Sequence, residues 1–363
     1  MHMITVRTES ISNKSSQWKP AIYPASLMIS LAGFVFNFVA QYPGGMTWDS
    51  FDMWGMGWES PWHDWHSTYV SLLMNLTRSF SQDPAVYLFI QLFLFWGGLY
   101  LFSAAIRKTV GIWALIIPLL GFTPMFLGLA GYLHKTPLQV AIFLFAFGLI
   151  FLHFAWGRGM SSKWVLLILI LLFIGTPLRR FGYLTVIPLL AFFLYTIFGR
   201  SGRRWLFIYF LGAFIISISS MMLYNFVTYD ILKAKKLNKI QTIYRYDLAA
   251  IYALTGIDYA PKFINENFSK PESAKQVFIT HGGLWKIIDI YKPAGNSLEV
   301  DAYKNYWLKA VRSHPDIWLQ HKVNSFKKSL GYDAQMIGEF HGIDEKTPNN
   351  VYGLRKSLNP LYR

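Results

Sequence analysis

The sequence contains no cysteine, and only 15% of its 363 residues are charged. The absence of cysteine excludes disulfide bonds, thiol catalysis and cysteine metal sites. An average soluble domain has about 25% charged residues, so the low charge content argues against that class. A glycine-rich phosphate loop is absent as well. The hydrophobic share of 53% and the aromatic share of 18% instead indicate a membrane protein.

Several apolar runs are long enough to cross a bilayer, which takes about 20 helical residues. They are Ala21 to Ala40, Ala85 to Ile106, Ile112 to Leu133, Leu138 to Trp156 and Trp205 to Val227. Two shorter runs, Trp164 to Leu178 and Tyr183 to Phe198, are separated by Arg179 and Arg180. This pair fits either two tilted spans or one re-entrant hairpin. The first alternative gives about seven transmembrane helices, and both place the termini on opposite sides.

Basic residues flank the apolar runs, and residues 228–363 have 20 Lys and Arg against 13 Asp and Glu. The latter excess is ordinary for a domain that rests on an anionic membrane face, so the net charge of +15 does not require nucleic acid. Residues 1–20 form a polar leader, and the apolar run behind them is longer than that of a signal peptide, which indicates a retained anchor. A cytoplasmic amino terminus satisfies the positive-inside rule. It places one acid, Glu9, and the following basic residues inside: Arg7, Lys14, Lys19, Arg107, Lys108, Arg158, Lys163, Arg200, Arg203 and Arg204.

The charge distribution divides the chain into a cytoplasmic leader (1–20), a transmembrane domain (21–227) that includes an outer loop (41–84), and an outer domain (228–363). In the outer domain, Ala302 to Leu330 is expected to form two helices separated at Ser313-His314-Pro315, because proline suits a first helical turn. The fold class is therefore an all-α polytopic membrane protein with interfacial helices in the first outer loop and a mostly helical outer C-terminal domain. The uncleaved anchor and the lack of cysteine suit a bacterial inner membrane.

The first outer loop is rich in tryptophan and acid, with five of the 14 tryptophans between Trp48 and Trp65. On a helix that begins at Asp49, aromatic and acidic side chains fall on opposite faces. This pattern is typical of a helix in the membrane interface, with its acidic face toward a protein cavity. The aromatic face consists of Phe51, Trp54 and Trp58, and the acidic face of Asp49, Asp52 and Glu59.

Two interpretations of Asp49 stand side by side. It can cap the helix, with Asp52 at the third helical position. It can also act as a general base on a hydroxyl, since partial desolvation would raise its pKa and strengthen it.

The cluster of His63, Asp64 and His66 also has two interpretations. Together with Asp49 it has the mixture of imidazole and carboxylate that suits a divalent cation such as Mn²⁺, Mg²⁺ or Zn²⁺. The spacing does not require a metal, however, and a hydrogen-bonded network that shapes the loop, together with Glu59, explains the same residues. No other cofactor is indicated.

Four basic residues in short connections violate the orientation rule: Arg78, Lys135, Arg179 and Arg180. A cation at the centre of a membrane helix costs about 2 to 3 kcal/mol, and less near the interface, so it usually has an anionic partner. A lipid phosphate is one such partner. The alternatives are a snorkelling anchor for Lys135 and a charge-compensated outer turn for the two arginines.

The order of these features resembles the GT-C superfamily of integral membrane glycosyltransferases. Trp48-Asp49-Ser50 lies where that family has an acid after its first span. Asp64-Trp65-His66 is similar to an Asp-Trp-His-Pro-Pro motif of bacterial members, with Ser67 and Thr68 in place of the prolines. Softer similarities are His134-Lys135-Thr136-Pro137, Leu178-Arg179-Arg180-Phe181-Gly182, Asp247-Leu248-Ala249 and the stretch from Trp307 to Pro315.

The resemblance implies an inverting transfer of a sugar from a polyprenyl phosphate to an acceptor hydroxyl outside the membrane. Asp49 would be the general base, with Asp52 beside it. Lys135, Arg179 and Arg180 would bind the donor phosphate. The sugar and the acceptor are not indicated. Competing functions are a lipid or polysaccharide transporter, a glycan polymerase or ligase with a pyrophosphate-linked donor, and a non-catalytic assembly protein.

Overall fold

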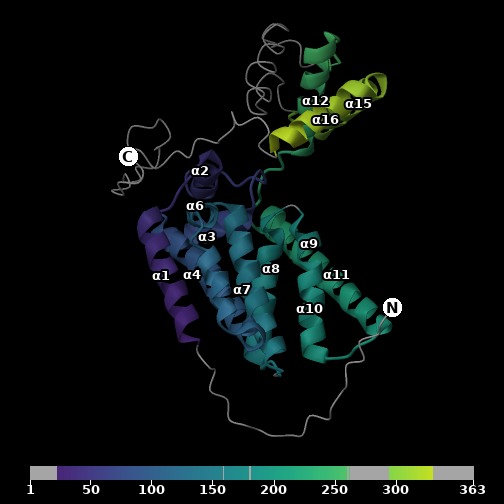
Figure 1. Ribbon diagram of the computed structural model, residues 1–363. Helices are drawn as coiled ribbons and strands as arrows, with labels where there is room; N and C mark the ends of the chain where they lie inside the picture. The colour runs from purple at the N-terminus through teal and green to yellow at the C-terminus, as the bar shows by residue number, and fades with distance from the viewer. Residues whose placement is uncertain (1–22, 158, 180, 260, 262–293, 330–363) are drawn as a thin grey trace.

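The computed structural model describes residues 23–157, 159–179, 181–259, 261 and 294–329 (Figure 1). Within these residues every regular element is a helix and no β-strand occurs, which confirms the prediction of an all-α chain. The elements, in chain order, are α1 (Pro24–Gln41), α2 (Trp48–Gly55), α3 (Thr68–Arg78), α4 (Ala85–Val110), η1 (Gly111–Leu115), α5 (Ile116–Leu120), α6 (Pro124–Gly131), α7 (Lys135–Ala155), α8 (Ser162–Gly175), η2 (Thr176–Leu178), α9 (Gly182–Thr185), α10 (Ile187–Phe198), α11 (Arg203–Asn225), η3 (Phe226–Ile231), α12 (Ile240–Thr255), α15 (Ser297–Ser313) and α16 (Pro315–Ser329).

Four helical stretches of the described chain are long and apolar enough to cross a membrane. They are Pro24–Gln41, Ala85–Leu120, Lys135–Ala155 and Arg203–Ile231. Each contains one of the predicted spans or nearly all of it. The protein therefore has the helices of a membrane protein.

The predicted span from Ile112 to Leu133 is not one continuous helix. It consists of η1, α5 and α6, with a break between Leu120 and Pro124. Pro124 begins α6, and the residue before a proline is disfavoured in the α conformation, so the helix cannot run through this point. The three short pieces pack along α4 and α1. The segment therefore still returns to the end of the bundle where α1 finishes.

The two short apolar runs form two helical stretches, Ser162–Leu178 and Gly182–Phe198. The first packs on α7 and the second on α11. The chain reverses between them, and Gly182 makes this reversal tight. A Cβ atom at Gly182 would lie 1.9 Å from the carbonyl oxygen of Thr176, so only glycine fits there.

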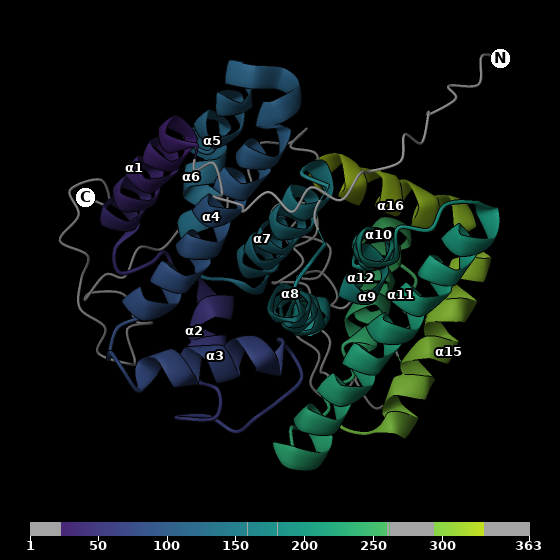
Figure 2. The same ribbon diagram turned by 90° about the horizontal axis from the view of Figure 1, so that it is seen from below.

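The connections of the bundle gather at its two ends. At one end the Gly45 N–H donates to the Gly131 carbonyl (3.1 Å) and the Leu133 N–H donates to the Gly45 carbonyl (2.8 Å). These bonds join the first loop to the start of α7. Helix α3 of the same loop lies across the bundle rather than along it (Figure 2). The opposite end has cations over aromatic rings, in the pairs Arg107 with Tyr23, Lys108 with Trp156 and Arg200 with Trp205.

The last described helices, α12, α15 and α16, pack around a small core of their own that includes Leu248, Tyr303 and Ala310. They lie beyond the end of the bundle that carries α2 (Figure 1). Helix α15 ends at Ser313 and α16 begins at Pro315, as the sequence predicts.

Protein covers two of the three residues of the aromatic face predicted for the loop helix. Helix α2 ends at Gly55, so Trp58 and Glu59 are not part of it. Phe51 and Trp54 are buried in the core of the bundle, where α2 packs on α3. The prediction that Phe51 and Trp54 face the membrane is therefore wrong, because helical periodicity identifies an apolar face but not whether protein or lipid covers it.

Candidate functional site

Asp49 is fixed beside the start of α7. It lies in the first turn of α2, where exposed backbone N–H groups favour a carboxylate. The N-cap is Thr47, so the interpretation of Asp49 as the cap is wrong. The Oγ1 atom of Thr47 lies 2.6 Å from the Tyr132 hydroxyl, and the Ser50 hydroxyl donates to the Leu133 carbonyl at 2.5 Å. These two contacts attach α2 to the segment before α7.

The Asp49 carboxylate faces two imidazoles and one ammonium group. Its Oδ2 atom lies 3.3 Å from His134 Nε2 and 3.9 Å from Lys135 Nζ. Its Oδ1 atom lies 3.8 Å from His66 Nε2. The side chain is 32% exposed, so a substrate hydroxyl can reach it.

Asp52 extends this network. Its Oδ1 atom lies 3.3 Å from His63 Nε2, and its Oδ2 atom lies 3.4 Å from His66 Nε2. Asp52 therefore contacts histidines rather than the first-turn backbone amides that the capping interpretation requires. The His66 side chain is 2% exposed and lies between the carboxylates of Asp49 and Asp52.

The hydrogen-bond partners assign the tautomers of these histidines. His63 Nδ1 accepts from the Trp65 N–H (3.3 Å), and His134 Nδ1 accepts from the Thr136 N–H (3.4 Å) as the N-cap of α7. His66 Nδ1 lies 2.8 Å from Lys135 Nζ, which is donor-only when charged. Each imidazole therefore carries its proton on Nε2, directed at a carboxylate.

The network sets the charges at neutral pH. Burial raises the pKa of Asp49, but the hydrogen bond from His134 and the attraction of His66 and Lys135 together lower it below its ordinary value. Burial, with the nearby ammonium of Lys135, lowers the pKa of His66 to about 4. Burial also lowers the pKa of His134. Asp49 is therefore ionised and both imidazoles are neutral. The prediction of a raised Asp49 pKa is wrong because it left out these partners.

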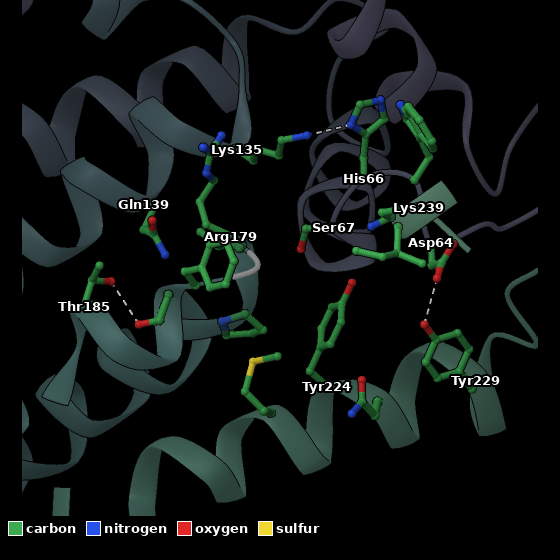
Figure 3. Close-up of a pocket in the computed structure, with 18 of the residues that line it drawn as sticks. Asp64, His66, Ser67, Lys135, Gln139, Arg179, Thr185, Tyr224, Tyr229 and Lys239 are labelled. Atoms are coloured by element: carbon green, nitrogen blue, oxygen red, sulfur yellow. Dashed lines mark hydrogen bonds between the residues drawn. The ribbon is translucent and has the colours of Figure 1, made fainter. Parts of the chain in front are cut away.

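A cavity of about 750 Å³ lies next to the network. Figure 3 shows polar side chains around it, and its polar wall includes His66, Lys135 and Arg179. Phe181 and Met221 contribute apolar surface. Asp49 does not line the cavity. His66 and Lys135 lie within 4 Å of its carboxylate and also line the cavity.

The cations predicted to meet a phosphate lie in this wall. Lys135 comes from the first turn of α7, and Arg179 follows η2. The Arg179 guanidinium donates to the Thr136 hydroxyl at 2.7 Å, which holds it beside the start of α7. Lys135, Arg179 and Asp49 are therefore at the same end of the bundle. Arg180 lies outside the described residues.

Glu59 is not part of this network. It accepts two hydrogen bonds from the Arg78 guanidinium, one of them 2.9 Å long. Arg78 also lies over the rings of Trp54 (5.2 Å) and Trp58 (4.9 Å). The prediction that Glu59 shares the acidic face with Asp49 is therefore wrong. Its ion pair gives Arg78 the anionic partner expected of an exception to the orientation rule.

Asp64 also points away from Asp49. Its carboxylate accepts from the Tyr229 hydroxyl at 2.9 Å and from the Leu237 N–H at 2.8 Å. Asp64 therefore attaches the first outer loop to the chain that follows α11.

The candidate metal ligands Asp49, His63, Asp64 and His66 do not converge on one point. In the part of the chain that the structure describes, no group of three acidic or histidine side chains is arranged to hold a metal ion. In addition, the Lys135 ammonium occupies Nδ1 of His66 and would repel a cation. These residues do not fit a divalent ion. The alternative, a hydrogen-bonded network that shapes the loop, describes His63, Asp64 and His66.

Two residues of the site received no role from the sequence. His134 contacts Asp49, and its position next to Lys135 in the sequence could have indicated that it belongs to the site. Lys239 lines the cavity from a segment after the last predicted span, and no local pattern indicated this. Comparisons with protein-family models, curated proteins and solved structures found no match to this chain.

Proposed function

We propose that this chain is an integral membrane glycosyltransferase that moves a sugar from a polyprenyl phosphate to an acceptor hydroxyl, with inversion. The observation that carries the proposal is the meeting of Asp49, Lys135 and Arg179 at one end of an apolar helical bundle, next to a cavity. An ionised base and two cations are the groups that this reaction needs, because it removes a proton and creates a phosphate anion.

The proposal includes seven membrane crossings. Helices α1, α4 and α7 and the stretch Arg203–Ile231 account for four crossings, the broken segment from Gly111 to Gly131 for a fifth, and the stretches Ser162–Leu178 and Gly182–Phe198 for two more. The end with Arg107, Lys108 and Arg200 is then cytoplasmic, in agreement with the positive-inside rule. The cavity faces the outer side of a bacterial inner membrane, together with α12, α15 and α16.

In the proposed reaction the acceptor oxygen attacks the anomeric carbon while its proton passes to Asp49. The new carbon–oxygen bond forms as the bond to the phosphate oxygen breaks, and the electron pair leaves with the polyprenyl phosphate. The lowered pKa of Asp49 keeps the carboxylate ionised at neutral pH, which is the state that a base needs. The N–H of His134 holds this carboxylate in place.

Lys135 and Arg179 stabilise the leaving phosphate in this proposal. Donors that are fixed before the reaction lower the barrier because they need no reorganisation as charge develops. The hydrogen bond to Thr136 provides such fixation for Arg179. Lys135 contacts both Asp49 and His66, so it connects the base to the phosphate side of the site.

Transfer of a labelled sugar from a synthetic polyprenyl phosphate by the purified protein in detergent tests this function. We expect a covalent product with the unchanged protein and a loss of about 100- to 10,000-fold in rate with Asp49→Asn. The asparagine keeps an oxygen for His134 and so preserves the fold. Asp301→Asn, at an exposed position of α15, is the matched control. Normal turnover by a folded Asp49→Asn protein would show that another group is the base.

The phosphate contact has its own test. Arg179→Gln is expected to raise the KM for the donor more than the KM for the acceptor, and Arg312→Gln, an exposed change on α15, to alter neither. Equal effects on both substrates would contradict the contact. A donor that crosses the membrane without a covalent product would indicate a transporter instead. Use of a pyrophosphate-linked glycan alone would indicate a polymerase or ligase.

A further inference from the structure

One wall of the cavity comes from the chain that follows α11. Tyr229, Asn238, Lys239 and Ile240 all line it. The sequence placed this part of the chain in a separate outer domain. In the structure this part of the chain lines the same cavity as Lys135.

This segment is attached to the first outer loop by paired hydrogen bonds. The Asp64 carboxylate accepts from the Tyr229 hydroxyl (2.9 Å) and the Leu237 N–H (2.8 Å). The backbones add two more bonds, from the Asp64 N–H to the Lys235 carbonyl (3.1 Å) and from the Lys235 N–H to the Trp62 carbonyl (2.9 Å). The position of residues 229–237 therefore depends on Asp64.

Lys239 lies two residues after Leu237, whose N–H donates to Asp64, and its side chain is partly buried. Figure 3 shows Lys239 among the side chains that line the cavity, together with Asp64 and Ser67. Asp64 thus fixes the backbone from which the Lys239 ammonium reaches the cavity.

The cavity wall has a positive balance. Its charged members are Lys135, Arg179 and Lys239 against Asp64, and His66 is neutral, so three positive charges and one negative charge give a net charge of +2. Both Asp64 oxygens already accept hydrogen bonds. A partly buried wall of this kind attracts an anion, and phosphate accepts charge-assisted hydrogen bonds from lysine and arginine.

We propose that Lys239 is a further phosphate-binding residue of this cavity, that it contacts the phosphate of the lipid-linked donor together with Arg179, and that Asp64 is its positioning residue. This inference rests on the proposed glycosyl transfer for the identity of the ligand. The donor phosphodiester carries one negative charge, and the released polyprenyl phosphate carries up to two. Lys239 therefore contributes more to binding of the released phosphate than to binding of the donor.

The test is equilibrium binding of labelled polyprenyl monophosphate to the full-length protein in detergent, without any transfer step. A charged hydrogen bond contributes about 1.5 to 3 kcal/mol, so Lys239→Gln is expected to weaken binding by about 10-fold or more. Lys235→Gln removes the same charge from an exposed side chain that does not line the cavity, and binding should stay within about twofold. Unchanged binding by Lys239→Gln, or an equal loss in both variants, would overturn the assignment.

Competition identifies the source of the phosphate. Inorganic phosphate is expected to compete weakly and phosphatidylglycerol not to compete at equal concentration. Equal competition by phosphatidylglycerol, lost with Lys239→Gln, would overturn the donor assignment in favour of a membrane lipid. If Lys239 proves necessary for polyprenyl phosphate binding while no sugar is ever transferred, the glycosyltransferase proposal fails and the phosphate site stands.

A double-mutant cycle tests the positioning role of Asp64. Asp64→Ala should weaken phosphate binding in the unchanged protein but add no loss in the Lys239→Gln background. A general structural role would give the same loss in both backgrounds and would overturn the role of Asp64. If Asp64→Ala does not fold, Asp64→Asn, which retains one acceptor for Tyr229, replaces it in the same cycle.

Discussion

The Asp247 carboxylate is the polar centre of the three helices α12, α15 and α16. We predict that Asp247→Ala destabilises the packing of these helices against one another. Its side chain is fully buried. It accepts hydrogen bonds from Trp307 Nε1 (2.9 Å), Trp318 Nε1 (2.8 Å) and Lys322 Nζ (2.6 Å), and His321 Nε2 lies 3.4 Å away. One residue of α12 thus connects α15 and α16.

The size of the effect follows from these partners. Removing one side of a fully buried ion pair costs about 3 to 5 kcal/mol, and the cost here is smaller because the Lys322 side chain is 35% exposed and water can hydrate its ammonium. Each indole N–H left without an acceptor adds about 1 kcal/mol or more, reduced where it can turn toward water. The total is on the order of 5 kcal/mol, which is the whole stability of a small domain. Asp247→Asn keeps one oxygen and should cost about half as much.

The same contacts set a pH dependence. Burial raises the pKa of Asp247, but the hydrogen bonds from His321, Lys322 and Trp307 lower it by more than burial raises it. The pKa in the folded protein therefore lies below the unfolded value of about 3.9. The stability that Asp247 contributes is therefore complete above about pH 4. It is lost as the pH falls through the folded pKa, and between pH 5 and 8 Asp247 adds no pH dependence.

Hydrogen exchange of the protein in detergent measures this effect by region. Asp247→Ala should reduce protection of α12, α15 and α16 by about 1,000-fold or more, with α4 and α7 unchanged as internal references. Asp301→Ala, at an exposed position of α15, is the control. If the three helices of the Asp247→Ala protein kept their protection, the buried carboxylate would not be what holds them together.

Three further perturbations test other parts of the structure. Gly182→Ala places a Cβ atom 1.9 Å from the Thr176 carbonyl oxygen, so it should cost about 3 kcal/mol or more and lower the thermal midpoint; an unchanged midpoint would contradict the tight reversal. Glu59→Gln breaks the ion pair with Arg78 and should cost about 1 kcal/mol or less, seen as faster proteolysis of residues 55–67, whereas an equal cleavage rate would show that the pair is dispensable. Because the His66 pKa lies at about 4, below its unfolded value of about 6.5, the unfolded chain binds the extra proton between these values; stability should therefore rise from pH 4 to 6.5, and His66→Gln should flatten this rise in a thermal melt.

The sequence predicts that Asp49, Lys135 and Arg179 lie at one end of the bundle, because topology constrains them. Asp49 lies nine residues after the end of the first apolar run, and Lys135 and Arg179 lie at later run ends on the same side. Chain direction alone therefore brings them to one end of the bundle. The meeting of these residues could be predicted without knowing how the helices pack.

Contacts between distant segments were not predictable in this way. Glu59 pairs with Arg78 because α2 ends before Glu59. Asp64 pairs with Tyr229 because the chain after α11 passes next to the first outer loop. Neither position has a periodic signal. For the same reason the position of Lys239 in the cavity wall could not be predicted from the sequence.

Hydropathy also has a limit that one segment shows clearly. The run from Ile112 to Leu133 is apolar enough for a single span, yet the structure breaks it before Pro124. Hydropathy reports the solvent that a segment prefers, whereas the backbone limits of proline decide whether one helix can form.

An experimental structure with bound polyprenyl phosphate tests the central claim most directly. We predict that the phosphate lies within hydrogen-bond distance of Arg179 and Lys135, with its sugar-bearing oxygen on the side of Asp49. A phosphate bound elsewhere, or a membrane boundary that separates Asp49 from Arg179, would contradict the account.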